Sequence, residues 1–329
     1  MNIFDIIIWP LRWVIELILV GAHTAWTALG LPGDSGWTWV LSILIIVLVV
    51  RSAMIPLMVR QIKSMRGMME LQPELKKIQD KYKGKRDQFS QQAMQQETMA
   101  LYKKHGSSPL SSCWPMLIQM PIFFALFRVL NTANHGEAGV GVMSQDHAVL
   151  LANSEIFGAP LSSVLSQANG NTNIIVVAIV LIVLMVATQF FTQRQITSQN
   201  ISEAAKASPM FRQQQMMMYL LPLVMAVSGI MFPIGLMVYW FLTNIWTTGQ
   251  QWWTIRNMPT PGSDAYKKRV ERLKEKGKWE NHPDNPANRV VRDGKTQRQL
   301  DLEAQANGGS GGQRQQPVSK NRQKKKKKK

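Results

Sequence analysis

The sequence predicts an all-α membrane protein in which five transmembrane helices form the core. Hydrophobic residues make up 46% of the 329 residues, yet the mean hydropathy is only -0.09. This average combines an apolar body, up to about residue 256, with a polar and basic remainder. Windows of about 20 apolar residues are long enough to cross a bilayer as helices. We expect the spans at residues 37–59, 109–130, 174–193, 216–230 and 233–255.

Residues 1–30 predict an amphipathic helix that lies in the membrane interface. With about 100° of rotation per residue, four ionisable side chains fall within one narrow face of this helix. They are Asp5, Arg12, Glu16 and His23. Apolar residues surround this face, a pattern typical of interfacial helices. The alternative is a tilted helix that crosses the membrane, which would move the N-terminus into the cytoplasm.

Residues 60–107 predict a cytoplasmic helical hairpin. The segment is too polar to cross a membrane, and its apolar residues recur at helical spacing on both sides of Lys83-Gly84-Lys85. That tripeptide favours a turn between two antiparallel helices. The methionines of the hairpin suit adaptable contacts with a partner. They also suit simple packing within the hairpin, and both interpretations stay open.

The distribution of Lys and Arg predicts the orientation of the chain. Residues 60–104 carry eleven Lys and Arg and residues 256–329 carry twenty-one, whereas the loop 131–173 carries none. All basic segments, including the loop 194–215, fall on one side if five spans begin outside and end in the cytoplasm. We therefore expect an external N-terminus, an extracytoplasmic loop 131–173 and a cytoplasmic C-terminus.

Residues 257–329 predict a basic, disordered cytoplasmic tail, with a short helix only around 265–278. The segment is rich in Pro, Gly, Gln and charge, so it cannot bury enough apolar area to offset the entropy of ordering. A flexible cationic tail binds phosphate backbones without sequence preference. We therefore expect contact with ribosomal RNA, by the tail and the hairpin, or with anionic lipid of the inner leaflet. The contact residues are Lys324, Lys325, Lys326, Lys327, Lys328 and Lys329.

Arg51 is the most informative residue of the chain because it interrupts the first span. It lies about three residues past the midpoint, roughly 12 Å of helix rise from the far end. A guanidinium there costs on the order of 3 kcal/mol on insertion scales. We expect it to face a polar interior or a water-filled cavity instead of lipid. The alternative is an arginine that extends its side chain to the headgroups.

Uncharged polar residues form stripes on three other predicted spans. Gln119 lies in the second span, Gln189 and Gln193 share one side of the third, and Trp240 and Asn244 share one side of the fifth. Such residues often join helices by hydrogen bonds. Together with Arg51, however, they can line a hydrated groove that is open to the cytoplasm and to lipid. The candidate groove residues are Arg51, Gln119, Gln189, Gln193, Trp240 and Asn244.

The residue types within the spans exclude several classes of protein. Arg51 and Arg128 are the only clearly ionisable side chains there, so no buried acid or histidine is available for acid–base chemistry, proton relay or metal ligation. One cysteine, Cys113, excludes an internal disulfide framework. We expect no catalytic residue, no cofactor and no metal, hence no enzyme. A channel or transporter with Arg51 as an anion site is an alternative, but the internal repeats common in transporters are not evident.

Four segments resemble the bacterial YidC membrane protein insertases, a family shared with the mitochondrial and chloroplast inner-membrane insertases. They are residues 48–57 (LVVRSAMIPL), 71–78 (LQPELKKI), 115–123 (PMLIQMPIF) and 232–240 (FPIGLMVYW). The resemblance covers about residues 37–256, in order, with the family's five-span topology. It is specific because it joins an intramembrane arginine, a basic hairpin and a proline-rich second span.

The resemblance implies a bacterial inner-membrane protein that receives hydrophobic segments of nascent membrane proteins, often from a ribosome. It also implies that the protein passes them into the bilayer without nucleotide hydrolysis, and the Sec translocon is a further candidate partner. Arg51 stands at the position of the family's groove arginine, and Gln193 and Trp240 match its polar and aromatic groove positions. Gln189 joins them only as a helical neighbour of Gln193. A non-catalytic chaperone that folds other membrane proteins overlaps with this description.

Overall fold

The computed structural model describes residues 3–85, 87–104, 114–202, 206, 215–216, 220, 222, 224–288, 290–292, 295–296 and 299. The chain divides into two compact units, Met1–Lys267 and Lys268–Lys329. The predicted fourth span, 216–230, and loop 194–215 lie only partly within the described residues, and Lys324 to Lys329 lie outside them.

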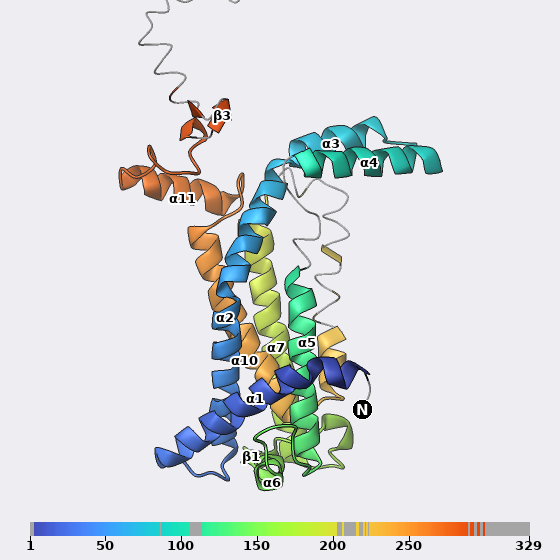
Figure 1. Ribbon diagram of the computed structural model, residues 1–329, viewed down its shortest axis with the longest axis vertical. Coiled ribbons are helices and arrows are strands. Elements are labelled where there is room, and N and C mark those ends of the chain that lie inside the picture. Colours follow the sequence, from blue (N-terminus) through green and yellow to red (C-terminus); the bar gives the residue numbers. More distant parts are fainter. Residues whose placement is uncertain are drawn as a thin grey trace, which may run out of the picture. The chain divides into compact units, whose positions relative to one another are not determined.

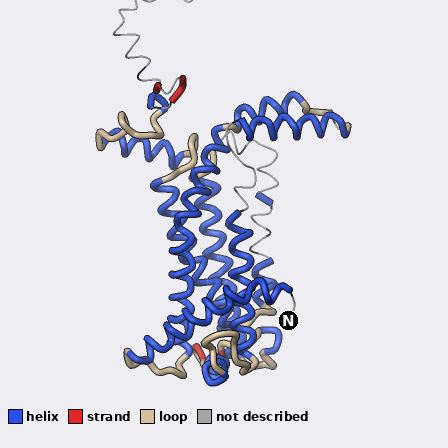
Figure 2. The backbone as a smooth tube through the Cα atoms, in the orientation of Figure 1, coloured by secondary structure: helices blue, strands red, loops and turns tan. Residues whose placement is uncertain are grey.

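Helices dominate the first unit (Figures 1 and 2). They are α1 (Ile3–Ala28), α2 (Gly36–Glu70), α3 (Gln72–Lys81), α4 (Gln88–Lys104), α5 (Trp114–Asn134), α6 (Gln145–Asn153), the 3-10 helix η2 (Leu165–Gln167), α7 (Thr172–Gln199) and α10 (Ile234–Asn257). The short strands β1 (Glu155–Ile156) and β2 (Ala159–Pro160) pair antiparallel between α6 and η2.

Three helices of the described residues are long and apolar enough to cross a membrane. They lie at Asp5–Ala28, Gly36–Met68 and Thr172–Gln199, in α1, α2 and α7. The first of them is the segment for which the sequence leaves an interfacial helix and a true span as alternatives. Helices α5 and α10 pack against these helices in the same core.

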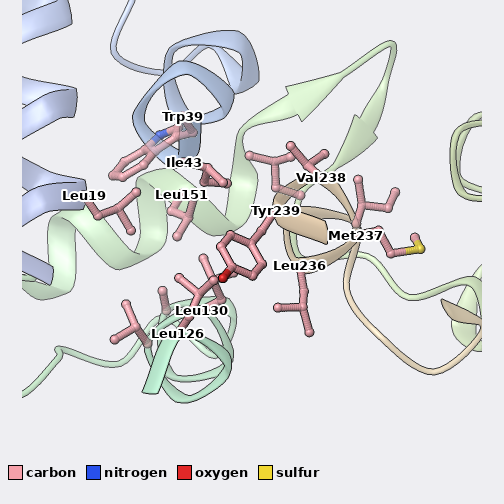
Figure 3. Packing of buried hydrophobic residues seen from close by; sticks show 14 of the residues in the cluster. Leu19, Trp39, Ile43, Leu126, Leu130, Leu151, Leu236, Met237, Val238 and Tyr239 are labelled. Atoms are coloured by element: carbon pink, nitrogen blue, oxygen red, sulfur yellow. The ribbon is translucent and has the colours of Figure 1, made fainter. Parts of the chain in front are cut away.

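The core lies where α1, α2, α5, α7 and α10 meet. Helices α7 and α10 pack together most extensively, followed by α1 with α2 and α1 with α5. Fully buried Ala125, Ala133 and Ala178 have small side chains, which let neighbouring helices approach closely. Figure 3 shows Tyr239 of α10 among these apolar side chains, with its ring directed toward Leu126 and Leu130 of α5.

Helix α1 turns its ionisable face toward the protein. The carboxylate Oδ1 of Asp5 pairs with Nε of Arg128 on α5 at 3.1 Å. Glu16 is completely buried and accepts hydrogen bonds from the backbone N–H groups of Val140 (2.9 Å) and Gly141 (2.7 Å). Figure 1 shows α1 running obliquely across α2 and α5. The predicted polar face therefore fastens α1 to the loop that follows α5.

Glycine is required where this loop meets α1. A Cβ atom at Gly139 would collide with the carboxyl group of Glu16, and one at Gly141 would collide with Trp13. The outer side of α1 is apolar, with Ile6, Ile7, Val14 and Leu17 exposed. Helix α1 therefore has an exposed apolar face and a polar face, as its periodicity predicts. The polar face contacts other parts of the protein.

Helices α3 and α4 form a hairpin with a thin apolar seam. Its buried members are Leu71, Leu75, Leu101 and Tyr102. Gly84, with a φ of +85°, lies in the turn between the helices, where a residue with a side chain would be strained. Glu97 of α4 accepts hydrogen bonds from Lys81 and from the Tyr82 hydroxyl, and these hold the pKa of Glu97 below its usual value.

Ordered structure continues beyond α10, where composition predicts disorder apart from a helix near 265–278. Helix α11 (Asp264–Glu275) is followed by the 3-10 helix η3 (Pro286–Asn288) and by strands β3 (Val290–Arg292) and β4 (Lys295–Thr296). Within the second unit, Arg269 pairs with Asp284 at 2.7 Å, and Asn288 donates to the carbonyl of Glu280 at 2.7 Å. Polar contacts order this segment, so its lack of apolar residues is a poor guide to its structure.

The buried carboxylate of Glu16 generates a stability prediction. Glu16→Ala removes the acceptor of two N–H groups, and hydrogen bonds to charged groups contribute about 1.5–3 kcal/mol each, so the free energy of unfolding should fall by roughly 3–6 kcal/mol. Leu17→Ala, at a neighbouring residue that is 44% exposed, should change it little. Unfolding in mixed micelles, followed by tryptophan fluorescence, measures both. Equal effects of the two substitutions would contradict the fastening role of Glu16.

Candidate functional site

Arg51 lines a cavity between α2 and α10. The cavity has a volume of about 70 Å³, and its other lining residues are Met54, Leu57, Met58, Gln61 and Gln250. A cavity of this size holds a few water molecules where polar partners are available. No carboxylate of the described residues forms a salt bridge with Arg51. The Arg51 side chain is half-buried.

Tyr239 and Gln119 extend this polar region toward α5. The Tyr239 side chain lies within electrostatic range of the Arg51 guanidinium. Its hydroxyl accepts a hydrogen bond from Nε2 of Gln119 at 3.3 Å, and the Oε1 atom of Gln119 is buried without a hydrogen-bond partner. Tyr239 thus bonds to Gln119 and lies near enough to Arg51 to interact with its charge. Arg51, Tyr239 and Gln119 come from three different helices.

The polar stripe shared by α7 and α10 mostly joins these helices. Nδ2 of Asn244 on α10 donates to the carbonyl of Met185 on α7 at 3.4 Å. The hydroxyls of Thr192 and Thr248 lie 2.7 Å apart across the same interface. Gln193 donates to Thr197 on its own helix at 3.3 Å. Hydrogen bonding between helices, the alternative that the sequence leaves open, accounts for the Asn244 and Thr192 contacts, whereas the Gln193 contact lies within α7.

Gln189 and Trp240 lie away from the Arg51 cavity. Gln189 faces a small void that is lined by Pro222 and Met225. Trp240 stacks on Phe123 of α5, with ring centroids 5.3 Å apart and an interplanar angle of 3°. Its other neighbour, Phe232, also contacts Phe127. The structure therefore does not bring Gln189, Gln193, Trp240 or Asn244 into the lining of the cavity that holds Arg51. We refer to Phe123, Phe127, Phe232 and Trp240 as the aromatic cluster.

Two cavity residues, Gln61 and Gln250, were not among the sequence candidates. Arg51, Met54, Met58 and Gln61 follow i, i+3, i+7 and i+10 spacing, which places them along one face of α2. This spacing was available in the sequence. Gln61 nevertheless follows the predicted span. Glutamine is common in that polar region, so this residue alone does not indicate a site.

An apolar cleft adjoins the Arg51 cavity. It has a volume of about 430 Å³ and lies between α2 and α10. Its lining residues are Ile55, Met58, Ile245, Trp246, Gly249, Gln250 and Trp253. Met58 and Gln250 line both the cleft and the Arg51 cavity, so the polar and apolar regions are continuous. We call this surface the α2–α10 cleft.

The described residues hold no group of three or more His, Cys, Asp or Glu side chains arranged to bind a metal ion. Arg51 thus places a cation in a small cavity next to an apolar surface.

Comparison with known proteins shows the family to which this sequence belongs. The model of the family described as 60Kd inner membrane protein matches residues 31–261. The chain belongs to that family. It is 42% identical to the membrane protein insertase YidC of Streptomyces avermitilis, over 83% of this chain and 63% of that relative. It is 39% identical to the membrane protein insertase YidC of Tropheryma whipplei (strain Twist), over 81% of this chain and 89% of that relative. It is 34% identical to the membrane protein insertase YidC of Bifidobacterium longum, over 79% of this chain and 78% of that relative.

Family membership and the apolar helices make the chain an integral protein of the cell membrane. The matched region includes Arg51, the α2–α10 cleft and the aromatic cluster. It ends before Lys324 to Lys329.

The α7–α10 interface generates a second prediction. The hydroxyls of Thr192 and Thr248 bond across it, whereas the Thr247 hydroxyl donates to Thr243 on its own helix. A double-mutant cycle of Thr192→Val and Thr248→Val should show a coupling of about 0.6 kcal/mol in unfolding free energy, the usual value for such bonds in membranes. The matched cycle of Thr192→Val and Thr247→Val should show none. Equal coupling in both cycles would contradict the assignment.

Proposed function

We propose that this protein is a membrane protein insertase and chaperone that acts without nucleotide hydrolysis. It receives hydrophobic segments of nascent membrane proteins at the Arg51 cavity and releases them sideways into the bilayer. The observation that carries the proposal is an unpaired guanidinium in a small cavity that is continuous with an apolar cleft. Relatives named membrane protein insertase YidC support it.

The cavity lowers the cost of moving a polar tail toward the far side of the membrane. An isolated polar group loses its hydrogen bonds to water when it enters hydrocarbon, at a cost of several kcal/mol. Water around Arg51 shortens the distance over which the polar tail must cross hydrocarbon. The guanidinium attracts acidic side chains strongly because the local dielectric constant is low. The Tyr239 hydroxyl and the unpaired Gln119 Oε1 offer neutral partners further along.

The α2–α10 cleft supplies the sideways exit. An apolar segment that enters the Arg51 cavity meets Met58 and Gln250 and can move past them onto Ile55, Ile245 and Trp253, which are exposed at the outer surface. Transfer of apolar area from water to lipid provides the driving force, at about 25 cal/mol per Å². No bond is made or broken, so no catalytic residue is required.

The remaining assignments belong to the same proposal. We place five spans in the inner membrane with the N-terminus outside and the C-terminus in the cytoplasm, and the α3–α4 hairpin in the cytoplasm. Gln189, Gln193, Trp240 and Asn244 belong to the α7 and α10 side of a wider groove that extends beyond the Arg51 cavity. The hydrogen bonds of Gln193 and Asn244 and the ring contact of Trp240 support a role in stabilising that side. We propose nascent chains, ribosomes and anionic lipid as partners, and the Sec translocon as a further one.

Arg51 provides the direct test. In proteoliposomes, a one-span substrate with an acidic outer tail should be inserted by the wild type, so that the tail becomes protected from external protease. A charge-assisted contact contributes about 1.5–3 kcal/mol, so Arg51→Ala should slow protection of this tail at least about tenfold. Arg51→Lys should retain more activity than Arg51→Ala.

A second substrate, with Gln and Asn in place of the acidic residues, controls for structural damage. Its insertion should depend less on Arg51. If Arg51→Ala protects the acidic tail as fast as wild type, the proposed role of Arg51 is wrong. Anion conductance through vesicles that contain only this protein would favour a channel instead.

The six terminal lysines test the ribosome as a partner. Replacement of Lys324 to Lys329 by glutamine should weaken co-sedimentation with ribosomes, and it should reduce the slope of log affinity against log salt by about 4–5, because each phosphate contact contributes roughly 0.7–0.9. Deletion of Gly308 to Gly312 provides a matched uncharged control and should leave that slope unchanged. If the lysine variant binds ribosomes normally but loses binding to anionic vesicles, lipid is the partner.

A further inference from the structure

A second polar cavity, of about 650 Å³, lies at the opposite end of α5 from Gln119. We call it the amide cavity because the side-chain amides of Asn131, Asn134 and Gln167 line it. Phe127 and Phe232 of the aromatic cluster also line it, and Met231 lies beside them. Its volume falls within the range of pockets that hold small ligands, about 300–1,000 Å³. The predicted extracytoplasmic loop contributes Gln167, so the cavity lies outside in the proposed orientation.

The three amides are available to a ligand. Within the described part of the chain, the side chains of Asn131, Asn134 and Gln167 make no hydrogen bond to protein. The Asn131 carbonyl accepts from Nδ1 of His135 at 2.7 Å, a bond that does not use the Asn131 side chain. An amide side chain carries two donor hydrogens and an acceptor oxygen. Three unpaired amides around one cavity therefore match a ligand that both donates and accepts, as each peptide group does.

Helix α5 connects the amide cavity to the Arg51 region. Gln119, Phe123, Phe127 and Asn131 follow one another at intervals of four residues, so they lie along one side of the helix. The twelve residues from Gln119 to Asn131 cover about 18 Å of helix rise. The two phenylalanines between them belong to the aromatic cluster, with Phe123 against Trp240 and Phe127 against Phe232. One helix side is thus polar at both ends and aromatic between them.

We propose that the amide cavity binds the polypeptide backbone of a substrate's polar tail after that tail has passed the aromatic cluster. The inference rests on the proposed insertase function and extends it to the far side of the membrane. Among the residues that the structure describes, no Lys or Arg lines the cavity, so this lining lacks the cations that recognise the phosphates of lipid headgroups. Neutral amides above an apolar floor of Phe127, Met231 and Phe232 suit an extended peptide, whose backbone and side chains make both kinds of contact.

The experiment uses a one-span substrate with an uncharged tail of Ser, Asn and Gly that carries one photocrosslinking residue. In wild-type proteoliposomes, the tail should crosslink to residues 131–167. The triple variant Asn131→Leu, Asn134→Leu, Gln167→Leu keeps the approximate side-chain volumes and removes the hydrogen bonds. Each lost neutral bond weakens binding roughly two- to tenfold, so tail protection should slow at least about fivefold. Gln145→Leu, at an exposed amide on α6, is the matched control and should behave like wild type.

Each outcome separates this proposal from the proposed function. A wild type that protects no tail refutes the insertase function itself. A wild type that inserts the substrate, together with a triple variant that inserts it equally well, overturns the amide cavity alone. If the triple variant fails to fold, the crosslinks of the wild type test the proposal. A substrate tail that crosslinks outside residues 131–167 overturns it. A photoactivatable lipid that labels residues 131–167 when the tail does not also overturns it.

Discussion

The structure depends on how a guanidinium is kept charged within an apolar bundle. Arg51 has no carboxylate partner among the described residues, so it is not neutralised by the protein. In the described part of the chain, Arg51 faces the cavity that Gln61 and Gln250 also line. A salt bridge would neutralise the guanidinium and leave no charge for a substrate. Under the proposed function, water in this cavity would solvate the guanidinium, and an acidic group of a substrate would take the place of that water.

Polar side chains of the bundle fall into two groups with different consequences. Asn244, Thr192 and Thr248 are paired, and they hold α7 and α10 together. Glu16 and Asp5 are paired as well, and they hold α1 against α5 and the loop that follows it. The second group includes Gln119, whose Oε1 atom is buried without a hydrogen-bond partner, and the three amides that line the amide cavity. The paired groups hold the helices together, and under the two proposals above the unpaired groups are the places where a polar chain would bind.

The sequence predicts the position of the intramembrane charge, Arg51, better than it predicts which residues surround that charge. One arginine within an apolar run carries a large energetic penalty, so its need for a cavity is visible without coordinates. Periodicity also identifies the polar face of α1, but it cannot tell whether that face meets water or Arg128, because both surroundings select the same residues. The pairing of Arg269 with Asp284 joins residues fifteen positions apart in a segment of low hydrophobicity, so composition alone predicts disorder there.

The aromatic cluster explains why two polar regions need not form a pore. A continuous wet path would conduct ions, whereas stacked Phe123 and Trp240 leave an apolar layer between Gln119 and Asn131. The layer is thin: Phe123 to Phe127 covers about 6 Å of helix rise, whereas the hydrocarbon core of a bilayer is about 30 Å thick. A polar tail that moves along α5 therefore loses its partners over a fraction of the membrane. Under the proposed function, a substrate would offset the cost of parting the rings, and without a substrate the apolar layer would stay in place.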